Sequence, residues 1–316
     1  IFNILTVERA KQYQDLAMQS RLRIPLIFGL DVVHGMRTIF PIPMAEAASF
    51  NLELIKKTAS VAAAETSAHG IHWTFAPMVD ISRDARWGRS MEGAGEDPWY
   101  GSQVAKARVE GFQGTDYNDR NTVLACAKHF AAYGAAVAGK DYAEADISEH
   151  TLLQVYLPPF RAAVEAGVGT FMNAFNEING IPATAHKPLL RDILKGEWGF
   201  KGFVETDYFA GAFNMNADQV IATGGSCCLS TFDVGTNFVT DTSDPSTVQY
   251  MRTACKNIMY TVVNSNAYAD ETSLTLALWM KIMVGVDVAV AVILILLEVV
   301  LVKKYKKRKS VLIVVE

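Results

Sequence analysis

Short apolar runs alternate along this chain with longer amphipathic stretches, and this alternation constrains the fold more than any other feature. The apolar runs have the length of buried strands, and the stretches between them have the length and periodicity of helices. Strands that alternate with helices form repeated βα units around a parallel sheet. The expected strands are 1–3, 25–31, 73–80, 123–130, 169–175, 203–207 and 227–230. The expected helices are 7–20, 51–69, 100–113, 148–166, 187–196, 215–223 and 245–264.

This pattern contains seven βα units, which predicts the α/β class and a TIM-type (β/α)8-like barrel over residues 1–264. The barrel is expected to be incomplete, with the eighth unit lost or degenerate. The chain opens on Ile1-Phe2-Asn3, which has the character of the end of a strand. We therefore expect the chain to be a fragment of a longer protein or a joined gene product.

Each of several expected strands ends in a polar or charged residue. Asp31 and Asp80 end the second and third strands, Lys128 and His129 lie in the last part of the fourth, and Asp207 ends the sixth. In a barrel of parallel strands, side chains at the C-terminal ends meet in one place, where such folds carry their active sites. The loops beyond these ends add His34, Trp87, Arg89, Phe175 and Tyr208.

This set of side chains suits a neutral ligand that is rich in hydroxyl groups, such as a sugar. Asp31 can accept hydrogen bonds from two vicinal hydroxyls. Arg89, Lys128 and His129 donate hydrogen bonds, and nearby cations favour the ionised form of a carboxyl group. A retaining glycosidase needs such a carboxylate to attack the anomeric carbon and a second carboxyl group to protonate the leaving oxygen. Trp87, Phe175 or Tyr208 could offer a flat apolar wall.

Taken singly, each of these residues also has a structural interpretation. Asp207 could cap the helix that follows it, and Lys128 with His129 could form a salt-bridged loop pair. Arg86 and Arg89 could form structural ion pairs with nearby carboxylates, and for Arg86 we favour this interpretation. The occurrence of all these residue types at successive strand ends favours a shared site.

Cysteine usage and charge exclude some other functions. The 4 cysteines are irregularly spaced and match neither a disulfide framework nor a zinc pattern, so we expect no metal and no cofactor. Cys126 lies within an expected strand and should behave as a small buried hydrophobic residue. The net charge of −4 includes a basic cluster at 303–309, so the rest of the chain is more acidic still and is a poor nucleic-acid binder.

The C-terminal part differs in character from the rest of the chain. Residues 265–281 are polar and then mixed, and we expect a linker there. Residues 282–302 form a nearly unbroken apolar run of 21 residues, which at about 1.5 Å per residue covers a hydrocarbon core of about 30 Å. The basic residues in 303–316 follow at once, which predicts a single-pass helix in the cell membrane, a cytoplasmic tail and an extracytoplasmic barrel.

Asp287 and Glu298 interrupt this apolar run. Each costs on the order of 2.5–3.5 kcal/mol if it is held charged at the centre of a membrane, and less near an end, where the side chain can reach the interface. The two acids are eleven residues apart, about three helical turns, and so share one face. Two interpretations stay open, an anchor that tolerates both acids or a helix that packs against a partner on that face.

Four motifs in this chain resemble glycoside hydrolase family 3, with the greatest similarity to the bacterial periplasmic type of β-glucosidase. They are Ile-Pro-Leu-Ile-Phe-Gly-Leu-Asp-Val-Val-His-Gly at 24–35, Arg-Asp-Ala-Arg-Trp-Gly-Arg at 83–89, Ala-Lys-His-Phe-Ala-Ala-Tyr-Gly at 127–134 and Gly-Phe-Val-Glu-Thr-Asp-Tyr at 202–208. The resemblance is strong over residues 1–210, and together the motifs are highly specific. Residues 214–269 are similar to a membrane-anchored branch of the same family.

The resemblance implies a retaining, exo-acting β-glycosidase, with β-glucosidase as the first choice. Such an enzyme removes terminal non-reducing sugars from β-linked oligosaccharides, here through a covalent intermediate on Asp207. Asp31, Arg89, Lys128 and His129 match sugar-binding residues of the family. Lys140 falls where the family has Arg or Lys, and Phe175 falls where many members have Tyr. Tyr208 directly follows the implied nucleophile and is also expected to contact the sugar. Glu205 departs from the family, which usually has an apolar residue two positions before the nucleophile. Strand periodicity puts Glu205 on the same side of the strand as Asp207, where its like charge is expected to raise the pKa of the nucleophile.

The resemblance leaves the general acid/base unassigned. In most of the family this group comes from an α/β sandwich domain, which we expect upstream of Ile1 or on a partner chain. Three functions therefore stay open: a β-glucosidase, a sugar-binding or vestigial barrel without an acid/base, and a β-N-acetylglucosaminidase. The last is the least favoured, because residues 131–134 read Ala-Ala-Tyr-Gly where those enzymes have Pro-Gly-His-Gly.

Overall fold

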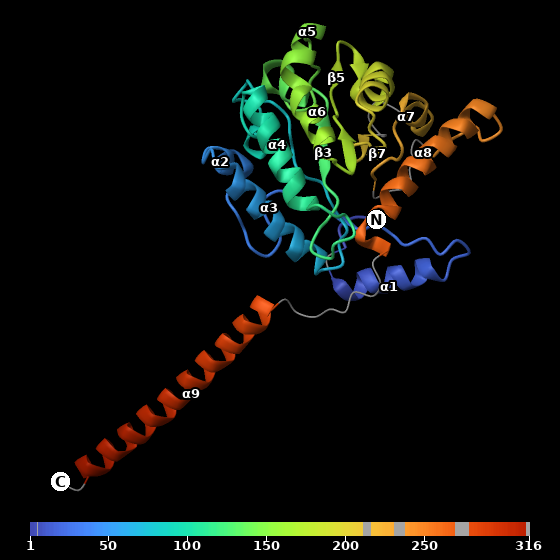
Figure 1. Cartoon of the computed structure of the whole chain (residues 1–316). Helices are drawn as coiled ribbons and strands as arrows, with labels where there is room; N and C mark the ends of the chain where they lie inside the picture. The colour runs from blue at the N-terminus through green and yellow to red at the C-terminus, as the bar shows by residue number, and fades with distance from the viewer. Residues whose placement is uncertain (5, 211–215, 231–237, 269–277, 314–316) are drawn as a thin grey trace. The chain divides into compact units, whose positions relative to one another are not determined.

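The structure is a computed structural model of the 316-residue chain, and it describes residues 1–4, 6–210, 216–230, 238–268 and 278–313. Two compact units make up the chain, Ile1–Glu271 and Thr272–Glu316. The first unit contains the strands and most of the helices, and the second contains one long helix, α9 (Leu278–Ile313) (Figure 1).

Seven parallel segments of the described chain pair in sequence order to form the wall of a barrel. They are the segment at Phe2, β1 (Gly29–Leu30), β2 (Trp73–Thr74), β3 (Cys126–Phe130), β4 (Thr170–Asn173), β7 (Phe203–Glu205) and the segment at Cys227. Their parallel order confirms the predicted α/β barrel. Within the described ranges, no pairing joins the Cys227 segment to the Phe2 segment, the place of the eighth unit. A short antiparallel hairpin consists of β5 (Glu177–Ile178) and β6 (Ile181–Pro182).

Helices cover the outside of these strands, and Figure 1 shows α3, α4 and α6 side by side there. The α-helices of this unit are α1 (Val7–Met18), α2 (Pro43–Ala47), α3 (Leu52–Ser67), α4 (Pro98–Gln113), α5 (Glu149–Thr151), α6 (Pro158–Glu165), α7 (Ala217–Thr223) and α8 (Pro245–Val263). Side-chain caps start many of them, because a short polar side chain accepts a hydrogen bond from a free backbone N–H of the first turn. These caps are Thr6, Asn51, Asp97, Ser148, Asn216 and Asp244.

The predicted helix over 148–166 is interrupted in the structure. A π-helical turn, Leu152–Tyr156, separates α5 from α6. Pro158 explains the break, because proline has no backbone N–H to donate and its ring crowds the preceding turn. The helix ends as predicted at Gly167, whose positive φ of 81° suits the left-handed end of a helix.

Other predictions differ from the structure at their edges. The expected strand at 227–230 forms one isolated bridge, at Cys227. The expected helix at 215–223 begins at Ala217, and Met215 lies outside the described residues. The sequence pattern did not indicate α2, the β5–β6 hairpin or several short helical turns. These turns are Gly88–Glu92, Tyr133–Ala135, Val137–Gly139, Ala183–Ala185 and Asn266–Tyr268, and Pro188–Glu197 is π-helical.

Side chains alternate along each strand between two apolar cores, as the period of two in a strand requires. Ala125 and Ala127 belong to the outer core between the strands and the helices. Leu124 and Cys126, the residues that precede each of these alanines, belong to the core inside the barrel. The interior core consists of Trp73, Phe75, Leu124, Cys126, Met172 and Phe203. Cys126 is fully buried, as predicted.

Glu205 also points into the barrel interior, where it is 1% exposed. Its Oε1 lies 3.7 Å from the Sγ of Cys126. Burial raises the pKa of Glu205 well above its ordinary value, and the charge of Asp207 raises this pKa further. Burial therefore favours the protonated form of Glu205.

The loop after β1, which carries Asp31 and His34, is held by buried polar contacts. Arg108 on α4 forms an ion pair with Glu46 on α2, and both side chains are less than a tenth exposed. The same guanidinium donates to the carbonyl oxygen of Val33 at 3.0 Å. These contacts fix the loop to the outer helices, so the strand end and the loop keep one geometry.

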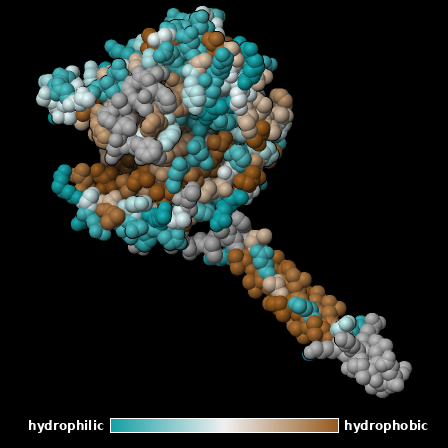
Figure 2. Space-filling model, turned by 180° about the vertical axis from the view of Figure 1, so that it is seen from behind, coloured by the Kyte–Doolittle hydropathy of each residue, from teal (hydrophilic) through white to brown (hydrophobic). Residues whose placement is uncertain are grey.

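The long helix α9 forms the described part of the second unit. Its stretch Lys281–Tyr305 is 25 residues long and contains an 18-residue window with a mean hydropathy of 2.8, none of which is buried. Figure 2 shows an apolar surface along most of this stretch, interrupted by a few polar patches. The predicted apolar run at 282–302 lies within it, and the stretch is long and apolar enough to cross a membrane. Of the expected linker, Ser265 is fully buried and 269–277 lies outside the described residues.

Replacing Arg108 by methionine tests the buried ion pair. The variant Arg108→Met leaves the Glu46 carboxylate buried without its partner, which should lower the free energy of unfolding by about 3–5 kcal/mol. Urea unfolding followed by tryptophan fluorescence measures the loss. The double variant Glu46→Leu, Arg108→Met is the control, and it should regain much of the lost stability. An unchanged urea midpoint in the single variant would contradict this account.

Replacing Glu205 by glutamine tests its neutral state. In the unfolded chain a glutamate ionises above about 4.3, whereas the folded protein keeps Glu205 protonated. Wild-type stability should therefore fall as pH rises above this value, by about 1.4 kcal/mol per pH unit until the folded pKa is reached. Glu205→Gln lacks this loss, so its free energy of unfolding relative to wild type should increase from pH 5 to pH 7. A constant difference over that interval would show that Glu205 is ionised in the fold.

Candidate active site

A cavity of about 580 Å³ opens at the C-terminal ends of the strands, a volume in the range of small-molecule sites. Its polar wall contains Asn3, Asp31, His34, Arg89, Glu92, Lys128, Asp207 and Tyr208. Its apolar wall contains Phe2, Val33, Ile42, Pro43, Phe75, Met91, Met172 and Leu229. Phe75 and Met172 also belong to the interior core, so the packed barrel forms the floor of the cavity.

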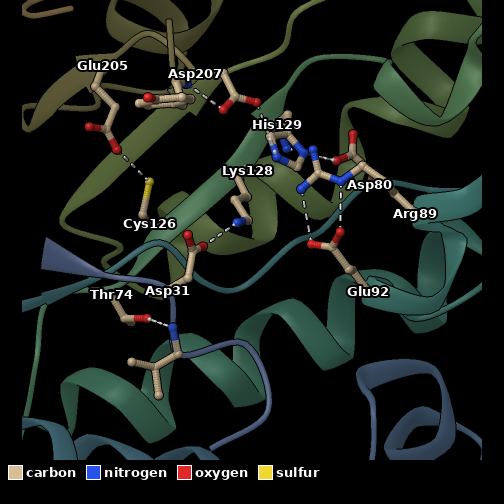
Figure 3. A network of polar contacts seen from close by, with 12 residues as sticks. Asp31, Thr74, Asp80, Arg89, Glu92, Cys126, Lys128, His129, Glu205 and Asp207 are labelled. Atoms are coloured by element: carbon tan, nitrogen blue, oxygen red, sulfur yellow. Dashed lines mark hydrogen bonds and ion pairs between the residues drawn. The ribbon is translucent and has the colours of Figure 1, made fainter. Parts of the chain in front are cut away.

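Lys128 and Asp31 form an ion pair across neighbouring strand ends in this wall. Lys128 Nζ lies 2.9 Å from Asp31 Oδ1, and the Lys128 side chain is 5% exposed whereas that of Asp31 is 59% exposed. The lysine is thus fixed beneath the surface, and the carboxylate faces the open cavity (Figure 3). In this position Asp31 can accept hydrogen bonds from a ligand.

His129 follows Lys128 and also faces the site. The register of β3 against β4 shifts between Lys128 and Phe130, and such an irregularity re-aims the side chains of a strand. His129 is 1% exposed. Its Nδ1 lies 2.9 Å from Oδ2 of Asp80, and its Nε2 lies 3.5 Å from Oδ2 of Asp207 (Figure 3). The imidazole therefore joins two buried carboxyl groups.

Asp207 lies just beyond the end of β7 and is 7% exposed. Its Oδ1 accepts a hydrogen bond from the backbone N–H of Tyr208 at 2.6 Å. Burial raises the pKa of Asp207 to about 6, although the Tyr208 hydrogen bond, Lys128 and Arg89 act to lower it. Burial, rather than Glu205, is the main cause, so the predicted mechanism for this shift was wrong. The carboxyl group remains mostly ionised at neutral pH.

Arg89 enters the site with its own acid partner. Its Nε lies 2.7 Å from Glu92 Oε1 and its Nη2 lies 3.1 Å from Glu92 Oε2, the two-pronged geometry that suits guanidinium and carboxylate. The guanidinium also lies 5.6 Å from the ring centre of Tyr133. Arg86, in contrast, pairs with Asp84 at 2.6 Å on the surface, which confirms the structural role favoured for it.

The structure does not bring three of the expected ligand-binding residues to the cavity wall: His129 lies behind it, bonded to Asp80, and Lys140 and Phe175 lie outside it. Lys140 is exposed and lies outside the wall. The ring of Phe175 packs against Tyr142, with ring centres 5.1 Å apart, and it too lies outside the wall. Trp87 is 1% exposed, so it is not available as a wall for a ligand. Tyr208 does line the cavity and is 43% exposed.

Sequence reasoning gave too little weight to three parts of the site. Asp80 ends the third predicted strand, and that position alone marked it as a candidate. Glu92 lies three residues after Arg89, a spacing that brings two side chains together in one helical turn. Phe2 and Leu229 lie on the first and last segments of the barrel, so only the closed fold places them in one wall.

Comparison with known proteins shows clear similarity. Over 211 residues the chain is 47% identical to the periplasmic β-glucosidase of Salmonella typhimurium, which covers 66% of this chain and 28% of the relative. It is 41% identical over 211 residues to a β-xylosidase of Formosa agariphila, covering 63% of this chain and 29% of the relative. The chain thus spans less than a third of the length of these relatives.

Solved structures agree with these relatives. A β-glucosidase from Listeria innocua superposes with a TM-score of 0.79 at 35% identity, covering 85% of this chain and 39% of that one. An exo-1,3/1,4-β-glucanase from a Pseudoalteromonas species superposes with a TM-score of 0.78 at 29% identity, covering 85% and 36%. Because the model of the glycosyl hydrolase family 3 N terminal domain matches residues 3–269, the chain belongs to glycosyl hydrolase family 3.

Proposed function

We propose that this chain is the barrel domain of a retaining, exo-acting β-glycosidase of the β-glucosidase type. Asp207 is the nucleophile in this proposal, and it forms a covalent glycosyl-enzyme with the terminal non-reducing sugar of a β-linked oligosaccharide. The observation that carries the proposal is a buried carboxyl group at a cavity wall, with a pKa of about 6 and with Lys128 and Arg89 beside it. The β-glucosidase and β-xylosidase relatives support the reaction class.

Each cavity residue has a role in this reaction. One oxygen of Asp207 bonds to the anomeric carbon as the glycosidic oxygen leaves, and water later breaks the ester. Lys128 and Arg89 favour the carboxylate form that attacks. Asp31 accepts hydrogen bonds from sugar hydroxyls at the open side of the Lys128 pair. The packed floor of the cavity accepts the end of a sugar chain rather than its middle, which suits exo action.

The general acid must come from outside the described cavity. The described wall contains two carboxylates besides Asp207, and each is bonded to a cation: Asp31 to Lys128 and Glu92 to Arg89. Because each is already held by a cation, neither carboxylate is assigned the role of the acid. A further domain of the longer protein or a partner chain would supply the acid. If neither does so, the barrel binds sugars without turnover, the second candidate function.

A β-N-acetylglucosaminidase remains the least favoured candidate. The loop after β3 has no histidine at 131–134. Tyr133 in this loop is fully buried, and its ring packs against His129 with ring centres 5.2 Å apart. A side chain fixed in this way cannot swing over a leaving group.

Trapping of the covalent intermediate tests the assignment of Asp207. Incubation with a dinitrophenyl glycoside of 2-fluoroglucose should label wild-type protein once, because the leaving group needs no protonation and the fluorine slows hydrolysis. Peptide mass spectrometry should place the label on Asp207, and Asp207→Ala should remain unlabelled. Asp84→Ala, which removes a partly exposed carboxylate that pairs with Arg86 outside the cavity wall, is the control and should label like wild type. A label on any other residue would refute the assignment.

Activity assays on the wild-type protein distinguish an enzyme from a sugar-binding module. An incomplete enzyme should turn over a dinitrophenyl β-glucoside slowly and leave cellobiose intact, since only the poor leaving group needs the missing acid. Calorimetric titration with glucose covers the remaining case. Glucose binding without reaction of either substrate would favour the sugar-binding barrel.

We also propose that α9 crosses the cell membrane once, with the barrel on the extracytoplasmic side. The apolar stretch Lys281–Tyr305 and the basic cluster at 303–309 support a span with a cytoplasmic end. The Salmonella relative is named a periplasmic protein, and it supports the side given to the barrel. Asp287 and Glu298 lie near the ends of the span, where their charges cost least.

Removal of the long helix tests this anchor. The full chain should stay with the membrane fraction after a carbonate wash, whereas a variant that lacks residues 278–316 should move to the soluble fraction. The difference is expected because the apolar stretch holds the protein by burial in lipid. A variant that lacks only 310–316 is the control and should stay with the membrane. A full chain in the soluble fraction would end the proposal.

A further inference from the structure

Asp80 lies behind the cavity and is bonded to the histidine that faces the nucleophile. It is 2% exposed and does not belong to the cavity wall. Its Oδ2 lies 2.9 Å from Nδ1 of His129 and also accepts the backbone N–H of His129 at 2.8 Å. Both contacts go to one residue, so Asp80 fixes the position and the rotation of that imidazole.

The other ring nitrogen of His129 faces the carboxylate that attacks in the proposed reaction. Nε2 of His129 lies 3.5 Å from Oδ2 of Asp207. When Asp207 is ionised, a lone pair on Nε2 would repel its oxygen, whereas a proton on Nε2 would attract it. The ionised nucleophile therefore needs the form of His129 in which Nε2 carries the proton.

Asp80 makes this form available in either of two protonation states. If Asp80 is ionised, it stabilises a doubly protonated imidazole. If Asp80 is protonated, it donates to Nδ1, and the neutral imidazole carries its proton on Nε2. Burial raises the pKa of Asp80 to about 7, so the protonated state is accessible at neutral pH. Burial, and after it the charges of Arg89 and Lys128, lower the pKa of His129 and so disfavour a charged imidazole, which favours this second state.

We propose that Asp80 is a positioning residue that acts through His129, holding the imidazole so that Nε2–H faces the Asp207 carboxylate. This inference rests on the proposed role of Asp207 as the nucleophile. It means that the rate of the reaction also depends on a buried residue outside the cavity wall. In the chain Asp80–His129–Asp207, one proton lies between Asp80 and Nδ1 of His129, and a second lies on Nε2 and faces Asp207. The charges around the chain are Asp31, Arg89, Glu92 and Lys128.

The variant Asp80→Asn separates positioning from a purely structural role. The amide oxygen can still accept the backbone N–H of His129, so the loop keeps its anchor. It cannot exchange a proton with Nδ1, and as an acceptor it holds the proton there. Nε2 then presents its lone pair to Asp207. An aspartate-to-asparagine change that fixes the wrong form of histidine in a catalytic triad lowers kcat by about 10⁴.

The test uses the full chain in detergent and the 2-fluoroglucoside reagent, with rates of labelling measured from pH 5 to pH 8. At saturating reagent, Asp80→Asn should label at least ~100-fold more slowly than wild type, with a half-saturating concentration within ~3-fold. The acid limb of its rate profile should move to higher pH than the wild-type limb near pH 6, because the Asp207 anion loses a donor. Glu205→Gln, which removes another buried carboxyl group, is the matched control and should label like wild type.

The outcomes distinguish this inference from the proposed function. No labelling of wild-type protein sinks the assignment of Asp207 itself. Wild-type labelling with equal rates and an equal acid limb in Asp80→Asn sinks only the role of Asp80. If the variant does not fold, nitrogen NMR of wild-type protein with labelled histidine decides instead. The signal of His129, assigned by its loss in His129→Gln, should show a proton on Nε2 at pH 7, and an unprotonated Nε2 would overturn the inference.

Discussion

Parallel pairing of the strands in chain order is the constraint on which the site depends. Each pairing brings the C-terminal end of one strand beside the same end of the next. Asp31, Lys128 and Asp207, which are far apart in the sequence, therefore reach one cavity. Alternate side chains of β3 fill the inner and the outer core. A shift of the strand by one residue would therefore move buried side chains from one core to the other, so the strand ends are fixed.

Opposed electrostatic effects meet at Asp207, the proposed nucleophile. Burial disfavours the charged form of Asp207, and two cations with one backbone N–H favour it. The balance gives a carboxyl group that is ionised at neutral pH but less stabilised than one in water. At Glu205, inside the barrel, burial dominates and Lys128 is the only cation among the main influences on its pKa, so the pKa lies well above its ordinary value. The two acids, one on β7 and one just beyond it, thus differ because Asp207 has Lys128, Arg89 and a backbone N–H acting against burial.

The sequence predicted the barrel and much of the cavity wall, and physical reasons explain where it stopped. Strand periodicity and strand ends are local signals, so Asp31, Lys128, His129 and Asp207 could be found from them. The positions of side chains in the loops beyond the strand ends depend on how those loops pack, and sequence periodicity does not predict this packing. Trp87 stands in a motif that carries a site residue, but its side chain is buried away from the cavity. Lys140 was expected from the resemblance alone, and its side chain is exposed. Pro158 is a local signal for a helix break, but the helical pattern on both sides of it predicted one continuous helix.

The pairing of Arg89 with Glu92 and of Lys128 with Asp31 has a consequence for ligand choice. Each cation in the described wall arrives with an acid already bonded to it, and Asp207 adds a further negative charge. The described wall is therefore electronegative in sum, and it has no surplus cation to offset a phosphate or a uronate. If the proposed function holds, sugars bearing such groups would meet repulsion at this wall before their hydroxyl stereochemistry is read.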